Sequence, residues 1–136
     1  MVENVPPTQV WKALKDDPQA QLVDVRTNAE WMYVGIPDLS EAGKQPLPIS
    51  WQLFPTMQVN QGFVEQLRHA GLDPSNKIYF LCRSGVRSLA AAKAAIEAGF
   101  PHAFNIADGF EGPPDGEGHR GRTSGWKADG LPWRQR

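Results

Sequence analysis

The fold of this protein is decided by one stretch of its sequence, Lys77-Ile78-Tyr79-Phe80-Leu81-Cys82-Arg83-Ser84-Gly85-Val86-Arg87-Ser88. Residues 77–81 form a short, mostly apolar run, which predicts a buried strand. An alanine-rich segment, residues 88–98, predicts a helix that ends at Gly99. Between them, residues 82–87 form a polar loop at the carboxyl end of the strand. A strand, a short loop and a helix in this order are typical of an α/β protein.

Outward from this unit, strands and helices alternate along the chain. Apolar runs predict three further strands, at residues 21–25, 47–51 and 103–106. Helical spacing and capping residues predict three further helices: over residues 9–15, after the cap Thr27 with Glu30, and from Asn60 to Gly71. We therefore expect an α/β fold in three layers. Its centre is a mainly parallel sheet of about five short strands, with helices on both faces.

Composition limits the classes of function. The chain of 136 residues is long enough for one domain, spanning residues 1–136. Its net charge of −1 offers no general attraction to nucleic acid or to an anionic membrane surface. The longest strongly apolar run, residues 78–82, is far shorter than the ~18 residues of a membrane-spanning helix. The first residues show no export signal, so we expect a cytoplasmic location.

Cysteine and histidine usage argues against a metal centre. Cys82 is the one cysteine of the chain, so neither an intrachain disulfide nor a thiolate-rich zinc site can form. The three histidines, His69, His102 and His119, have no metal-ligand spacing. We therefore expect no metal and no cofactor.

The segment around Cys82 predicts a reactive thiol. A tight turn before a helix directs backbone N–H groups inward, and the helix start adds partial positive charge. Arg83 and Arg87 add two full charges nearby. Such surroundings lower the pKa of a thiol from about 8.5 toward roughly 3.5–7.5. The alternative is an inert buried thiol, but two arginines and Gly85 within five residues are unusual for such a position.

Three blocks of the sequence are similar to signature segments of single-domain rhodaneses, a family of sulfurtransferases. Residues 82–88 resemble the active-site loop of that family. Residues 22–26, Leu-Val-Asp-Val-Arg, followed by Glu30-Trp31, resemble its N-terminal signature. Residues 108–110 and 126–132 resemble its C-terminal signature. The blocks occur in the family's order and cover nearly the whole chain, so the chain is identified as a rhodanese-like domain.

The resemblance implies roles for particular residues. Cys82 is the nucleophile. Asp24 and Arg26 orient the loop through hydrogen bonds, although an ordinary ion pair at a strand end explains them equally well. The other loop residues bind the substrate: Arg83, Ser84, Gly85, Val86, Arg87 and Ser88.

The resemblance also implies a reaction and its partners. The Cys82 thiolate takes the outer sulfur of a small donor such as thiosulfate and forms a persulfide. An acceptor then removes the sulfur: cyanide in an assay, and a thiol or an acceptor protein in the cell. This two-step covalent catalysis needs no cofactor or metal, and it involves no nucleic acid and no membrane.

Two features depart from the family pattern. Residues 35–38, Gly-Ile-Pro-Asp, lack the histidine that often follows the first signature. The C-terminal signature is split by a glycine- and proline-rich loop insertion at about residues 111–125. We expect this insertion to be a surface flap on the active-site side that adds nothing to the core. Three of its side chains are candidates for contact with an anionic substrate: His119, Arg120 and Arg122.

Two other functions remain open at this point. A phosphatase or arsenate reductase uses a related loop, but phosphatase loops hold one more residue between cysteine and arginine than Cys82 and Arg87 have between them. Arsenate reduction with an internal resolving thiol would need a second cysteine. A module that carries persulfide or binds a partner without turnover would have the same loop sequence as the enzyme.

Overall fold

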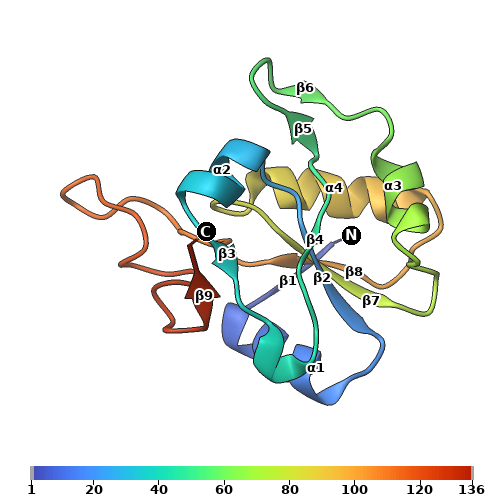
Figure 1. The fold of residues 1–136 in the computed structure, drawn as a ribbon, viewed down its shortest axis with the longest axis horizontal. Helices are drawn as coiled ribbons and strands as arrows, with labels where there is room; N and C mark the ends of the chain where they lie inside the picture. Colours follow the sequence, from blue (N-terminus) through green and yellow to red (C-terminus); the bar gives the residue numbers. More distant parts are fainter. Residues whose placement is uncertain (1, 136) are drawn as a thin grey trace.

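A five-stranded parallel sheet forms the centre of the molecule (Figure 1). The computed structural model describes residues 2–135. In spatial order β1-β8-β7-β2-β4, the strands are Glu3–Val5, Ala103–Ile106, Lys77–Leu81, Ala20–Asp24 and Leu47–Pro48. All four neighbouring pairs are parallel. The predicted α/β fold with a parallel sheet of about five strands is therefore confirmed.

Strand β7 is the central strand of the sheet, and its buried side chains confirm the buried strand that its apolar sequence predicts. Tyr79 lies opposite Leu22 of β2 and Phe104 of β8. Successive side chains alternate between the two faces, because the side-chain period of a strand is two. Ile78 and Phe80 pack into the core on one face, whereas Tyr79 packs into the core on the other.

Helices cover both faces of the sheet (Figure 1). Helix α1 (Pro7–Asp16) packs on one face together with the buried side chain of Trp126. Helices α3 (Phe63–His69) and α4 (Val86–Glu97) pack on the opposite face, where small alanines bring α4 close to the sheet. Helix α2 (Asn28–Tyr33) follows β2 and begins with the predicted capping box between Thr27 and Glu30. The three predicted layers are therefore present.

Several short elements were outside the sequence prediction. Strand β1 adds an edge to the sheet. Strands β3 (Ile36–Pro37) and β9 (Trp133–Arg134) pair antiparallel, and β5 (Gln52–Leu53) pairs with β6 (Gln58–Val59) as a hairpin. A 3-10 turn, η1, covers Ser40–Ala42. Because β3, β5, β6 and β9 are two residues long, their sequences carry no detectable periodicity.

Two predicted helix starts were wrong. Helix α4 begins at Val86 and not near Ser88, so the loop between β7 and α4 contains only residues 82–85. Helix α3 begins at Phe63, and Asn60 does not cap it. The Asn60 side chain instead accepts a hydrogen bond from the Gly62 N–H in a local turn (3.0 Å). Such local side-chain bonds offer the backbone an alternative to helical bonding.

The insertion at residues 111–125 contains no helix or strand and projects from the body of the molecule (Figure 1). The prediction of a surface loop is correct for its middle. The expectation that it adds nothing to the core is wrong at its ends, because Gly112 and Gly125 are buried. These glycines lack a side chain and therefore fit where backbone segments approach closely.

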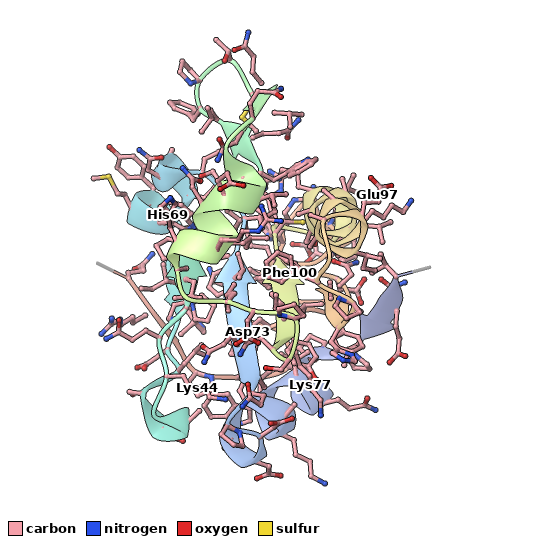
Figure 2. The ribbon with its side chains drawn as sticks, turned by 90° about the vertical axis from the view of Figure 1, so that its right-hand side faces the viewer. Lys44, His69, Asp73, Lys77, Glu97 and Phe100 are labelled. Carbon is pink, nitrogen blue, oxygen red and sulfur yellow. The ribbon has the colours of Figure 1, made fainter. Side chains whose placement is uncertain are left out.

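The two ends of the parallel strands carry different side chains. Figure 2 shows Lys44, Asp73 and Lys77 near the end where the strands begin, far from the projecting β5–β6 hairpin. Lys77 there forms an ion pair with Asp17 (2.7 Å). Cys82 lies at the opposite end of the strands, directly after the last residue of β7. Within residues 2–135, no helix is long and apolar enough to cross a membrane.

Candidate active site

Cys82 lies at the carboxyl edge of β7, beside a pocket of about 500 Å³. This is the edge of a parallel sheet where ligands usually bind. The cysteine loop and the start of α4 contribute five lining residues: Cys82, Arg83, Ser84, Val86 and Arg87. Four others come from α2, its end and the β5–β6 hairpin: Glu30, Val34, Gln52 and Met57. Glu111 completes the lining from the C-terminal segment.

Two hydrogen-bond donors hold the sulfur of Cys82. The Gly85 N–H donates to Sγ at 3.0 Å, and the Ser88 hydroxyl lies 3.2 Å from Sγ. Gly85 has a φ of +109°, in the left-handed region that favours glycine, and this turn directs its N–H toward the sulfur. The Gly85 N–H is therefore a fixed donor to the negative charge of a Cys82 thiolate, and the Ser88 hydroxyl is a second donor when its proton points to the sulfur.

Ser88 also connects the sulfur to a buried amide. Its hydroxyl lies 2.5 Å from Oδ1 of Asn105, and Nδ2 of Asn105 donates to Asn4 (2.8 Å) and to the Gly85 carbonyl (3.2 Å). A serine hydroxyl has one proton, so it donates to either Asn105 or the sulfur, but not to both at once. Sequence reasoning did not identify Asn105 as part of the site. Its polar side chain inside an apolar strand was the one available signal.

The predicted substrate-binding residue Arg87 has a partner within the protein. Its guanidinium donates to both carboxylate oxygens of Glu30, at 2.6 and 2.9 Å. The two side chains are 17% and 18% exposed. Burial lowers the pKa of Arg87, but the hydrogen bonds and the charge of Glu30 outweigh it and raise that pKa above its usual value. Arg87 lines the pocket, yet Glu30 already balances its charge.

Asp24 and Arg26 form a buried ion pair below the loop. Arg26 donates to the two oxygens of Asp24 (2.9 and 2.7 Å) and to the Gly35 carbonyl (2.8 Å). Its guanidinium lies 4.4 Å from the centre of the Phe110 ring, and the Phe110 N–H donates to the Cys82 carbonyl (2.8 Å). Among the described residues, the Arg26 side chain makes no hydrogen bond to the cysteine loop. The predicted direct orientation is replaced by this indirect path through Phe110.

The start of the insertion is bound to the cysteine loop. The N–H groups of Glu111 and Gly112 both donate to the Arg83 carbonyl, at 2.9 and 3.1 Å. This places the insertion on the active-site side, as the sequence predicts. His119, Arg120 and Arg122 of the insertion do not line the pocket. Arg120 donates to the Gly112 carbonyl (2.6 Å), and Arg122 lies 3.8 Å from Asp115.

No group of three or more His, Cys, Asp or Glu side chains suited to a metal ion occurs within residues 2–135. Both charges of the Glu30–Arg87 pair lie in the same pocket.

Comparison with known proteins identifies the family. Residues 4–136 match the family described as STR4 middle domain. The chain is 31% identical over 121 residues to the rhodanese-like domain-containing protein 4, chloroplastic, of Arabidopsis thaliana. The matched region covers 88% of this chain and 23% of the Arabidopsis protein. This chain belongs to the rhodanese-like STR4 middle-domain family.

Other relatives match the rhodanese-like domain along its full length. It is 39% identical over 133 residues to a protein of Rickettsia rickettsii described as an uncharacterized RP600 homolog, with 97% of each chain covered. Among solved structures, Rv0390 from M. tuberculosis is 46% identical, with a TM-score of 0.89 over 99% of this chain and 98% of that chain. The family and the fold predicted from the sequence are thereby confirmed.

Proposed function

We propose that this rhodanese-like domain is a sulfurtransferase that carries sulfane sulfur as a persulfide on Cys82. The Cys82 thiolate attacks the outer sulfur of thiosulfate, the S–S bond of the donor breaks, and sulfite leaves with the electron pair. An acceptor thiolate then attacks the outer sulfur of the persulfide and regenerates the Cys82 thiolate. Each step forms one S–S bond and breaks another, so no external oxidant or reductant is needed.

The observation that supports this proposal best is the pair of donors on the Cys82 sulfur. The Gly85 N–H stabilises negative charge on Sγ of the attacking thiolate and of the thiolate regenerated when the acceptor takes the sulfur. The Ser88 hydroxyl adds to this when its proton points to Sγ and not to Asn105. The pocket beside Cys82 gives a donor access to the loop. The family membership of the chain supports the same chemistry.

A phosphatase function receives less support from this geometry. Arg87, the arginine that would bind a phosphate oxygen, lies in the first turn of α4 and is bidentate on Glu30. A phosphate dianion would have to compete with that carboxylate. The loop before the helix is also short, with residues 82–85 only.

The proposal is tested by intact-protein mass spectrometry after incubation with thiosulfate. We expect one added sulfur on the wild type and none on Cys82→Ser. With cyanide as acceptor, the wild type should form thiocyanate over many turnovers. Persulfide formation without turnover with any thiol or cyanide would instead identify a persulfide carrier. The absence of any sulfur adduct, from thiosulfate or an organic persulfide, would overturn the proposal.

A further inference from the structure

The charges that line the pocket are balanced. Arg83 and Arg87 supply two positive charges, while Glu30 and Glu111 supply two negative charges. Glu30 binds Arg87 through both carboxylate oxygens, so each Nη of that arginine already donates a hydrogen bond to a carboxylate. Arg83 is exposed and lies in the same lining as Glu111. An incoming dianion therefore meets no net positive charge, which weakens its attraction to the pocket.

The pocket also has an apolar side. Val34, Met57 and Val86 line it from three different elements of the chain. Val86 is 77% exposed and Met57 is 37% exposed, so both side chains present apolar surface beside the reactive loop. Such surface is normally buried by a partner or a ligand when it lines a functional site.

The size of the pocket points in the same direction. Its volume of about 500 Å³ falls within the ~300–1,000 Å³ that is usual for organic ligands. Thiosulfate, an ion of five heavy atoms, would leave most of this space to water. It would also leave the apolar side chains of Met57 and Val86 without a contact.

We infer that the preferred sulfur donor is an organic hydropersulfide with an apolar body, and not the thiosulfate dianion. This inference rests on the proposed function. The Cys82 thiolate attacks the outer sulfur of R–S–SH, the S–S bond of the donor breaks, and R–S⁻ leaves while Cys82–S–SH forms. The group R lies against Val34, Met57 and Val86. The balanced charges of the pocket do not repel this donor, which carries at most one negative charge.

The test compares rates of persulfide formation on Cys82 for three donors, measured by mass spectrometry at short times. The donors are thiosulfate, methyl hydropersulfide and hexyl hydropersulfide, the last two released in situ from masked precursors. For each donor, the rate is divided by the rate of the same sulfur transfer to free cysteine, so that the intrinsic reactivity of the donor cancels. We expect the wild type to react with the hexyl donor at least about tenfold faster than with thiosulfate, and faster than with the methyl donor.

Two sets of variants separate charge from apolar contact. Glu30→Gln and Glu111→Gln each remove one negative charge and should lower the ratio of hexyl to thiosulfate rates by roughly five-fold, the effect of one unit charge at short range in water. Val86→Ser should lower the ratio of hexyl to methyl rates. Glu41→Gln is the matched control, because Glu41 is exposed, lies in η1 and does not line the pocket.

The outcomes distinguish this inference from the proposed function. If thiosulfate and the hexyl donor react at equal rates, or thiosulfate reacts faster, the inference is overturned while the sulfurtransferase proposal stands. The inference also fails if Glu41→Gln changes the ratio as much as Glu30→Gln and Glu111→Gln do, because net charge alone would then explain the preference. If no donor modifies Cys82, the proposed function fails first.

Discussion

At the scale of single residues, the proposed chemistry centres on the surroundings of the Cys82 sulfur. Two donors reach Sγ, and one of them, the Ser88 hydroxyl, also faces Asn105. Asn105 is fixed in turn by Asn4 and by the carbonyl of Gly85. The Gly85 peptide therefore takes part twice, with its N–H on the sulfur and its carbonyl on the amide.

Ser88→Ala should slow the reactions of Cys82. The change removes the hydrogen bond that the hydroxyl donates to a charged sulfur when its proton points away from Asn105. A hydrogen bond to a charged group contributes about 1.5–3 kcal/mol, so we expect rates to fall by as much as roughly 10- to 100-fold. The measurements are persulfide formation and alkylation by iodoacetamide at pH 7. Ser75→Ala, a remote exposed serine, should leave both rates unchanged. Equal rates in Ser88→Ala and the wild type would contradict this role of the hydroxyl.

Gly109→Ala should disrupt the close backbone contact between residues 109–112 and the cysteine loop. Gly109 has a φ of +60°, and a Cβ there would lie 2.7 Å from the Arg83 carbonyl carbon and against the Cys82 carbonyl. We expect a loss of more than about 2 kcal/mol of stability, beyond the roughly 1 kcal/mol of left-handed strain alone. Urea unfolding measures this loss.

The control for that substitution is Gly118→Ala. Gly118 has a φ of +79°, and a Cβ there would meet nothing within 4 Å. It therefore carries the same kind of backbone strain without the collision. If both variants lose the same stability, close packing at Gly109 is not the cause.

At the scale of elements, the site depends on a contact between α2 and α4. Glu30 serves both as the third residue of the α2 capping box and as the partner of Arg87. Burial raises the pKa of Glu30, but the hydrogen bonds and charge of Arg87 outweigh it, and the pKa lies below its usual value of 4.5. One carboxylate thus links a helix start to the reactive loop.

This pair should make stability depend on pH. Because the folded pKa of Glu30 is lowered, its contribution is complete above pH 4.5 and is lost as pH falls through the folded pKa. At pH 7 we expect the free energy of unfolding of Glu30→Gln to be about 1–3 kcal/mol lower than that of the wild type. That difference should shrink in acid below pH 4.5. A difference that stays constant down to pH 3 would rule out the ion pair as its source.

At the scale of the whole molecule, the C-terminal segment after β8 packs against the cysteine loop, residues 82–85. Hydrogen bonds from Phe110, Glu111 and Gly112 hold the carbonyls of Cys82 and Arg83. Trp126 then enters the core beside α1, fully buried. The insertion between them is therefore anchored at both ends and free only in its middle.

Two deletions should separate the anchors from the middle. Replacing residues 115–119 with two glycines removes only the tip, whose ends already meet through the Asp115 N–H and the His119 carbonyl (2.7 Å). We expect a melting temperature within a few degrees of the wild type, because loop shortening changes closure entropy by less than about 1 kcal/mol. Sulfur-transfer rates should also be unchanged, since residues 115–119 do not line the pocket.

Replacing residues 113–125 with two glycines should instead lower the melting temperature markedly. This change removes the Arg120 contact to Gly112 and the close approach of Gly125 to the Gly109 carbonyl. Thermal unfolding followed by circular dichroism measures both variants. Equal melting of the two deletions would show that the ends of the insertion are as passive as its tip.

The sequence by itself determined the fold class and the place of Cys82 between a strand and a helix. The apolar run of β7, the glycine turn after Cys82 and the alanine face of α4 are local patterns, and each predicts its element without knowledge of the rest of the chain. The capping box at Thr27 and the loop character of residues 111–125 are local in the same sense. Local patterns are readable because backbone propensity and side-chain period act over a few residues.

Only the tertiary structure decided how the charges of the site are used. Glu30 and Arg87 lie 57 residues apart, and nothing in either segment shows that they meet. The same holds for Ser88 with Asn105, for the two-residue pair β3–β9, and for Arg26, which reaches the cysteine loop only through Phe110. These contacts depend on the order of strands in the sheet, and that order brings distant segments to one edge. Whether an arginine of the loop stays free for a substrate is therefore a property of the packed molecule, because its partner comes from another element.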